Sequence, residues 1–366
     1  MFPTQFTGAS FTWERKELNN ILKINSGRDY KQLNSGNIPV YGTGGYMLSV
    51  NDKLSDTVAV GIGRKGTIDK PLYLKAPFWT VDTLFYCTSK ENSDVKFIYL
   101  LFHIINWKRY DESTGVPSLS KNTISSIKTY VPKVKEQDHI SKLFFSLDNT
   151  LQLHEDHLQF LHSFKSFLLQ KMFFDNDIPP LLRFNKFTEK WNQCRLNDHT
   201  IVTMGQSPNS KNYTNNQTGK ILVQGNADLY KNKVLKRVFT TEVTKTAVKN
   251  DILISVRAPV GDIARNQYES VVIGRGIASI KGNDFLYYQL EKMKNNGFWN
   301  KYIAGSTFES ITGKDLKNTK IYTTISDEER KIGNIFSSLT KIIQLQEHKI
   351  DSLKKLKQFL LQNMFI

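Results

Sequence analysis

The sequence predicts an α+β protein in which two mixed α/β domains are separated by two long helices with coiled-coil spacing. The first observation is an internal repeat: residues 140–174 and 332–366 align without a gap at an offset of 192, with 15 of 35 positions identical. The second is that residues 136–174 contain no Gly or Pro, as long helices require. The third is that the segments between contain many short apolar runs bounded by Gly and Asn, which is typical of strands. We therefore expect two copies of one frame.

The start of each copy is marked by a second match. Five residues match at an offset of 178: Phe6, Trp13, Leu18, Asn19 and Gly27 against Phe184, Trp191, Leu196, Asn197 and Gly205. Because the two offsets differ by 14, the second copy is longer by that amount between its matched ends. The interiors do not align, so we expect a duplicated frame with different contents.

The repeats set the expected segment boundaries. Pro179 and Pro180 stop the first helix, and Ser326 with Glu329 has capping-box spacing at the start of the second. The expected segments are a first domain (1–135), a first helix (136–174), a linker (175–188), a second domain (189–325) and a second helix (326–366).

Both helices carry apolar residues at alternating spacings of three and four, the pattern of a coiled-coil seam. The seam residues are Leu147, Leu151, Leu158, Leu161, Leu168, Met172, Leu339, Ile343, Ile350, Leu353, Leu360 and Met364. His154, Lys165, Gln346 and Lys357 occupy skipped seam positions, where polar residues fix a register at some cost in stability. The alternative is that both segments are core helices of one globule.

The net charge of +16 is concentrated in two blocks. Residues 1–135 carry 18 Lys and Arg against 11 Asp and Glu, and residues 181–325 carry 22 against 11. Two basic bodies suggest two contacts with a polyanion. The alternative is a solvated, Lys-rich surface with no such partner.

Catalytic motifs are absent from the sequence. It has no phosphate-binding loop, no H-E-x-x-H, and no Gly-rich cofactor loop after a strand. Cys87 and Cys194 alone give neither a disulfide framework nor a zinc site. No apolar run approaches the roughly 18 residues that span a bilayer, and the start of the chain does not have the pattern of a secretory signal. We expect a cytoplasmic protein without a membrane partner, a metal or a catalytic residue.

Binding chemistry is plentiful in Gly-bounded loops, although a plain surface turn is the alternative for each one. Arg can grip guanine with two hydrogen bonds, and Asn and Gln are the usual readers of adenine. The candidate DNA-binding residues are Lys31, Tyr41, Thr43, Tyr46, Arg64, Lys65, Gln206, Ser207, Asn209, Lys211, Tyr213, Gln224, Asn226, Arg257, Arg275, Ser306 and Thr307.

This layout resembles the specificity subunit of type I restriction–modification enzymes. The resemblance covers the whole chain and is carried by the two helix ends (FLLQ-x-MF) and the repeated entries FTGASFTWERKEL (6–18) and FNKFTEKWNQCRL (184–196). STGVPSLSKNTI (113–124) and GSTFESITGKDL (305–316) look like the loop that closes each recognition domain. Gly115-Val116-Pro117 in the first copy departs from the Gly-Ser-Thr form of the second.

The resemblance implies two target recognition domains that read a split, asymmetric site in double-stranded DNA, with the two helices paired antiparallel as a spacer. It also implies two methyltransferase subunits, which use S-adenosylmethionine, and two restriction subunits driven by ATP and Mg²⁺. The chain itself would hold no cofactor. The other functions left open are a stand-alone DNA-binding or scaffold protein and, third, a nuclease.

Overall fold

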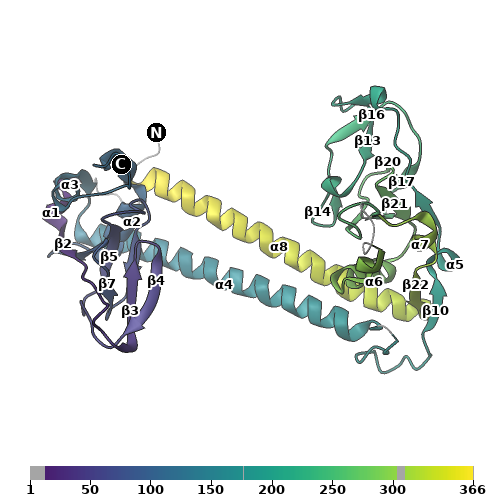
Figure 1. The fold of residues 1–366 in the computed structure, drawn as a ribbon, viewed down its shortest axis with the longest axis horizontal. Coiled ribbons are helices and arrows are strands. Elements are labelled where there is room, and N and C mark those ends of the chain that lie inside the picture. Colours follow the sequence, from purple (N-terminus) through teal and green to yellow (C-terminus); the bar gives the residue numbers. More distant parts are fainter. Residues whose placement is uncertain (1–12, 176, 303–309, 366) are drawn as a thin grey trace. The chain divides into compact units, whose positions relative to one another are not determined.

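The computed structural model describes residues 13–175, 177–302 and 310–365. The chain forms two compact units, each of which includes part of both long helices. Unit 1 is Met1–Glu155 with His348–Ile366, and unit 2 is Asp156–Glu347. The long helices are α4 (Val134–Met172) and α8 (Ser326–Met364), drawn in teal and yellow in Figure 1.

Unit 1 contains a four-stranded sheet with the order β2-β8-β5-β6, a three-stranded sheet with the order β4-β3-β7, and the pair β1-β9. Besides the long helices, its elements are β1 (Glu14–Glu17), α1 (Leu18–Ile21), β2 (Leu22–Ser26), β3 (Ser35–Gly42), β4 (Gly45–Val50), β5 (Ala59–Gly63), β6 (Leu72–Leu74), β7 (Trp79–Thr80), β8 (Leu84–Ser89), α2 (Val95–Ile104), η1 (Trp107–Tyr110), α3 (Lys121–Ser126) and β9 (Lys128–Val131).

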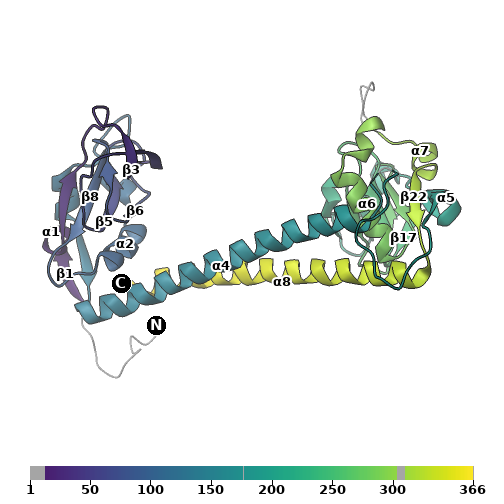
Figure 2. The same cartoon turned by 90° about the horizontal axis from the view of Figure 1, so that it is seen from below.

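The core of unit 1 lies between α2 and the central strands, which Figure 2 shows beside one another. All five residues of β5 are buried, as expected of a central strand without a polar face. Helix α2 begins where the Asp94 side chain accepts the backbone N–H groups of Lys96 and Phe97. It buries Phe97 and its neighbours against the sheet.

Unit 2 repeats this plan with more strands. Its sheets have the orders β11-β21-β18-β19-β15-β14 and β12-β16-β13-β20-β17, with the pair β10-β22. Its elements are β10 (Asn192–Arg195), α5 (Leu196–His199), β11 (Val202–Met204), η2 (Ser210–Asn212), β12 (Tyr213–Thr214), β13 (Lys220–Val223), η3 (Asn226–Asp228), β14 (Leu229–Tyr230), β15 (Lys233–Val234), β16 (Val238–Thr240), β17 (Thr246–Val248), β18 (Ile252–Ser255), β19 (Ile263–Arg265), β20 (Ser270–Ile273), β21 (Ile277–Ile280), α6 (Asp284–Asn295), η4 (Phe298–Tyr302), α7 (Gly313–Lys317) and β22 (Lys320–Thr323).

The two long helices and their antiparallel pairing are confirmed within each unit. In unit 1, Lys357 pairs with Asp148, and Lys354, which is earlier on α8, pairs with Glu155, which is later on α4. In unit 2, Leu161 packs with Leu339 and Ile343. The pairing thus runs in opposite directions along the two helices, as the family resemblance implied; the coiled-coil spacing alone is compatible with either direction.

The predicted seam residues face inward to different degrees. Six are buried: Leu151, Leu161, Met172, Leu339, Ile343 and Ile350. The half-buried ones are Leu147, Leu158, Leu168, Leu353, Leu360 and Met364.

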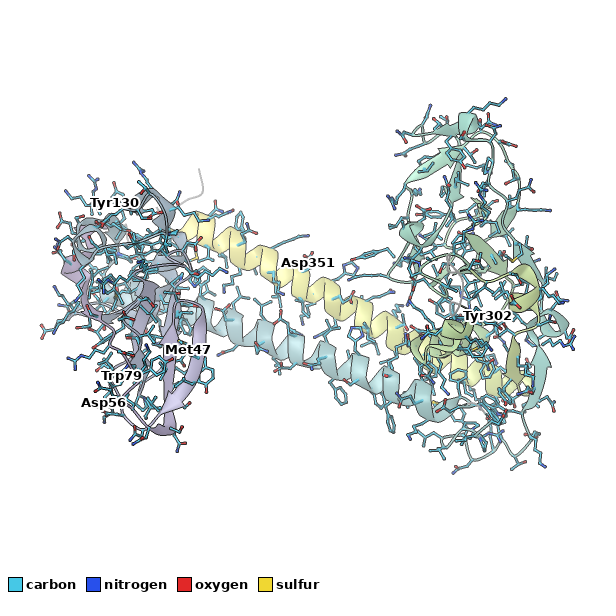
Figure 3. All side chains as sticks on the ribbon, viewed as in Figure 1. Met47, Asp56, Trp79, Tyr130, Tyr302 and Asp351 are labelled. Carbon is cyan, nitrogen blue, oxygen red and sulfur yellow. The ribbon has the colours of Figure 1, made fainter. Side chains whose placement is uncertain are left out.

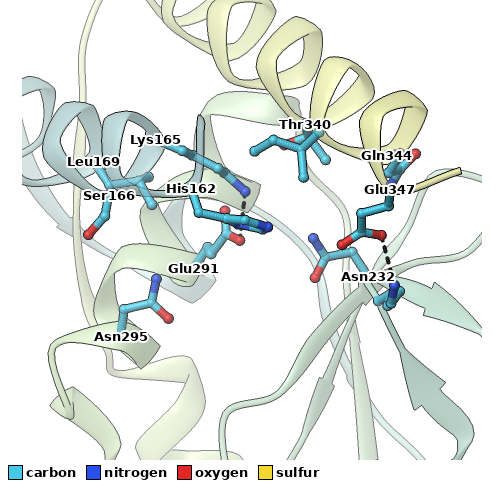
Figure 4. Close-up of a pocket in the computed structure, with 12 residues that line it drawn as sticks. His162, Lys165, Ser166, Leu169, Asn232, Glu291, Asn295, Thr340, Gln344 and Glu347 are labelled. Atoms are coloured by element: carbon cyan, nitrogen blue, oxygen red, sulfur yellow. Dashed lines mark hydrogen bonds and ion pairs between the residues drawn. The ribbon is translucent and has the colours of Figure 1, made fainter. Parts of the chain in front are cut away.

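The polar seam residue Lys165 is buried in unit 2. Its ammonium lies 2.9 Å from Glu291 of α6 and 5.1 Å from the centre of the Tyr288 ring. The pair borders a cavity of about 250 Å³ that also has Lys231, Asn232 and Glu347 in its wall (Figure 4). The Lys165–Glu291 pair therefore ties the spacer helix to the second domain.

Two local expectations need correction. Helix α4 begins two residues earlier and ends two residues earlier than predicted. Ser326 is the first helical residue of α8, and the Glu329 carboxylate accepts the backbone N–H of Thr324, so the expected capping box is replaced by a contact two residues earlier.

Across the described ranges, no helix combines the length and the apolar character that crossing a bilayer demands.

We predict that Lys165→Met destabilises unit 2 by about 3 kcal/mol, because the Glu291 carboxylate is then left buried without its cation. Denaturant unfolding and hydrogen exchange would measure the loss. The matched control is Lys142→Met on the same helix, whose exposed pair with Asp138 contributes less than about 1 kcal/mol. Equal losses in the two variants would contradict the role of the Lys165 pair.

Candidate nucleic-acid interface

In unit 1, four loops meet at the ends of the central strands and are joined through backbone atoms. The N–H of Arg28 donates to Thr80 O at 2.8 Å, and the N–H of Val81 donates to Tyr41 O at 3.0 Å. The N–H of Arg64 donates to Thr83 O at 2.8 Å. The closing segment 117–119 completes the group, since the Leu119 N–H donates to Arg64 O at 2.9 Å.

Unit 2 contains the same four hydrogen bonds at equivalent places. The N–H of Gln206 donates to Ile273 O at 2.9 Å, and that of Gly274 donates to Val223 O at 2.8 Å. The N–H of Val256 donates to Gly276 O at 2.9 Å, and that of Ile311 donates to Val256 O at 2.9 Å. We call this arrangement, present once in each unit, the loop frame.

Both loop frames depend on a glycine that the repeat had already matched. A Cβ added at Gly27 would lie 1.9 Å from Val81 O, and one at Gly205 would lie 2.2 Å from Gly274 O. No other residue allows the chain to pass so close to the neighbouring carbonyl groups. The frame is thus common to both units, while the side chains that it presents are not.

In unit 1, the loop frame presents a cationic and partly apolar surface. Arg64 and Lys65 are exposed, and the Arg64 guanidinium lies 6.0 Å from the centre of the Phe85 ring, on which Lys121 also rests. The Thr43 hydroxyl lies close to Gly66, so the β3–β4 turn adjoins the Arg64 loop.

The β3–β4 hairpin adds exposed apolar side chains to this surface. Tyr46 is 64% exposed, with its ring edge against Tyr41 and its hydroxyl 3.2 Å from Ser49 Oγ. Met47 is 48% exposed and covers Gly42 (Figure 3). Tyr41 itself is half-buried against the core.

In unit 2, the loop frame presents amides and guanidinium groups. Gln206, Arg257 and Arg275 are exposed, and Gln224 and Asn226 are half-buried. Within the described ranges, these five side chains make no hydrogen bond or ion pair with the protein. By contrast, the guanidinium of Arg265 is held by Asp284 at 2.6 Å. Unpaired donors and acceptors gathered at one place are available to a ligand.

Other predicted residues of unit 2 serve the loop itself. The Ser207 hydroxyl accepts the Arg275 N–H, and the Asn209 side chain accepts the Lys211 N–H. The Glu242 carboxylate accepts the backbone N–H of Asn209 and the amide of Asn212, and these hydrogen bonds hold its pKa below the usual value. Ser207, Asn209 and Glu242 therefore order the segment that carries Gln206.

The remaining predicted residues lie elsewhere. Lys211 is exposed on η2, and Tyr213 is half-buried at the start of β12. Lys31 is exposed in the turn before β3. Ser306 and Thr307 lie outside the described residues.

The sequence analysis missed Arg28 and Asp82, which are exposed on the unit 1 loop frame. Arg28 occupies the place of Gln206, and the signal was available: it follows Gly27 as Gln206 follows Gly205, at the offset of 178. Asp82 occupies the place of Arg275. No sequence signal pointed to Asp82, because its loop falls in the part of the repeat that does not align.

No cluster of three or more His, Cys, Asp or Glu side chains suited to a metal ion occurs in the part of the chain that the structure describes.

The comparisons with known proteins agree with the duplicated frame. A family model for the type I restriction modification DNA specificity domain matches residues 11–162 and 188–355. Two copies of this domain cover most of the sequence, and the chain belongs to this family.

Individual relatives are more distant. The putative type I restriction enzyme MjaX specificity subunit of Methanocaldococcus jannaschii is 27% identical over 283 residues, covering 71% of this chain and 65% of that protein. The MjaIX specificity subunit of the same organism is 27% identical over 126 residues, covering 32% and 28%. This chain therefore matches less than two thirds of either relative.

A solved structure extends the likeness of fold to the whole chain. The crystal structure of the type I restriction-modification system S subunit from M. genitalium has a TM-score of 0.70 at 14% identity, and the match covers 100% of this chain and 99% of that one. The fold predicted from the repeat is thereby confirmed.

We predict that Gly276→Ala disrupts the unit 2 loop frame, because the added Cβ would lie 2.3 Å from Gln224 O. A loss of about 1–3 kcal/mol is expected from such overpacking. Gly225→Ala is the matched control, since its Cβ would meet nothing within 4 Å and its φ of −171° suits any residue. Hydrogen exchange of β20 and β21 would measure both, and similar protection in the two variants would contradict the packing argument.

Proposed function

We propose that this protein is the DNA-recognition subunit of a type I restriction–modification enzyme, and that each loop frame reads one half of a split, asymmetric site. The observation that carries the proposal is the identical backbone frame with different side chains in the two units. A duplicated frame provides two similar ways of docking on a duplex, and different side chains provide two different readings. Membership of the specificity-domain family supports the same function.

The chemistry of the two surfaces suits base recognition in the major groove. Lys65 and Arg257 occupy equivalent positions, since their loops bridge to Ser118 and Ser310 in the same way. Cations at a shared position suit phosphates, which are present in every sequence. The amides of Gln224 and Asn226 have no partner in the described parts of the chain, and they suit the N6 and N7 atoms of adenine.

The spacer helices suit a partner that binds in two copies. Unit 1 exposes Leu153, Leu356 and Phe359, and their equivalents at the repeat offset are exposed in unit 2: Leu345, Phe164 and Phe167. Exposed apolar side chains that recur in both copies of a repeat mark a partner surface. We assign these surfaces to two methyltransferase subunits.

Catalysis belongs to the partners in this proposal. The methyltransferase subunits would bring S-adenosylmethionine, and two restriction subunits would bring ATP and Mg²⁺. The second candidate, a stand-alone DNA-binding or scaffold protein, would leave the recurring apolar surfaces without an occupant. Co-purification of a methyltransferase with this chain separates the two candidates.

We predict that exchanging residues 20–115 for those of a related chain changes one half of the recognised sequence and leaves the other half intact. Each loop frame is complete within its own unit, so the second reading is not disturbed. Mapping of methylated adenines with the methyltransferase subunits present gives the result. A simultaneous change of both halves would refute independent reading.

Single alanine changes at Arg64, Gln206 and Asn226 are expected to reduce binding to target DNA by about 1–3 kcal/mol each, and binding to random DNA much less. The reason is that a lost base contact matters only on the correct sequence. Lys249→Ala, whose charge is paired with Glu269 on the surface, is the control and leaves both affinities nearly unchanged. Equal losses on both DNAs would assign the three residues to phosphates instead.

A further inference from the structure

Asp82 and Arg275 occupy the same position in two equivalent turns, with opposite charge. In unit 1, the Leu84 N–H donates to Val81 O at 3.0 Å, and Asp82 is the first residue inside this turn. In unit 2, the Ile277 N–H donates to Gly274 O at 3.0 Å, and Arg275 is the first residue inside. Both side chains are exposed on their loop frames.

The turn itself does not require a carboxylate. Asp stabilises a β-turn from the position before the two central residues, whereas Asp82 is one of the central residues. The Asp82 carboxylate makes no hydrogen bond or ion pair with any described residue; Arg64 donates only to the Asp82 backbone carbonyl, at 3.5 Å. Since Arg275 fills the same position in the other turn, the local structure accepts either charge.

The Asp82 carboxylate opposes the binding of DNA unless a base compensates for it. Arg28, Arg64 and Lys65 are the exposed cations of this loop frame, so the surface as a whole suits phosphates. A carboxylate placed among them repels the DNA backbone. It gains an attractive partner only where a base presents a hydrogen-bond donor.

The major groove offers such donors as the exocyclic amines of cytosine and adenine. Next to its amine, adenine presents the N7 acceptor, which repels a carboxylate, whereas cytosine presents its N4 amine alone. Arg275, at the equivalent position, suits the two acceptors of guanine.

We propose that Asp82 reads a cytosine through its N4 amine, and that Arg275 reads a guanine at the corresponding position of the other half-site. The proposal rests on the function proposed above and assigns one base contact within it. Asp82 and Arg275 are then paired specificity determinants, and their exchange alters base choice without altering the frame.

The test uses the full chain assembled with its methyltransferase subunits. The probes are duplexes in which each base pair of the mapped half-site, the one that changes on exchange of residues 20–115, is replaced in turn by the other three. We expect the wild-type complex to prefer cytosine at one position by about tenfold in methylation rate, a typical value for one base contact. Asp82→Ala reduces that preference to about twofold and leaves the other positions unchanged.

Reciprocal substitutions test which base each of the two residues reads. Asp82→Arg changes the preferred base at that position to guanine, and Arg275→Asp changes one guanine of the other half-site to cytosine. Asp52→Ala, which removes an exposed carboxylate after β4, is the control for charge and leaves every preference intact. The unaltered half-site reports folding within each variant, because its preferences persist only in a folded complex.

Two outcomes would overturn the assignment: Asp82→Ala weakening all positions equally, or the relaxed position preferring a base other than cytosine. A wild-type complex that methylates all probes at one rate would instead refute the proposed function, and the two failures are therefore distinguishable.

Discussion

The tryptophan–glutamate contact at the start of each long helix is the interaction on which both units depend. The indole N–H of Trp13 donates to Glu136 of α4 at 3.0 Å, and that of Trp191 donates to Glu328 of α8 at 3.1 Å. In each unit, a phenylalanine at the end of the opposite helix packs on the same indole. The ring centres of Phe365 and Trp13 are 5.9 Å apart, and those of Phe173 and Trp191 are 6.4 Å apart. One tryptophan in each unit thus anchors the beginning of one helix and the end of the other. Only a chain that is duplicated in both its entries and its helices can make this contact twice.

In the proposed function, the loop frame allows recognition to vary while the structure stays the same. Its hydrogen bonds join backbone N–H and carbonyl groups, which every residue except proline carries. The side chains that the loop frames present are therefore not needed to hold the loops together. This explains why Arg28 and Gln206, or Asp82 and Arg275, can occupy the same place although their chemistry differs. Other residues stabilise the loops: the Glu242 carboxylate, for example, accepts the backbone N–H of Asn209.

The same property decides how much could be predicted from the sequence. The helices and the entries were predictable from the residues, because Trp13 and the seam leucines make side-chain contacts that only certain residues can make, whereas the antiparallel pairing was implied by the family resemblance. The loop frame was not predictable beyond Gly27 and Gly205, where a Cβ is excluded. Elsewhere in the loop frame, the contacts are between backbone atoms and do not restrict the residue type. The helix start at Ser326 was predicted correctly, but the capping box was wrong, since Glu329 satisfies the N–H of Thr324 and a short spacing pattern cannot tell these partners apart.

Buried charge follows the same division between frame and surface. Lys165 and Arg183 are each held by a carboxylate, Glu291 and Glu328, where helix meets domain. Replacing either partner leaves a charge without compensation, so these positions resist change. On the loop frames the exposed charges have no such partner within the described chain, and water compensates for them until a ligand does. A substitution on a loop frame therefore has little effect on the free energy of unfolding. The protein can therefore alter what it contacts at the loop frames while the paired charges keep the helices and domains in place.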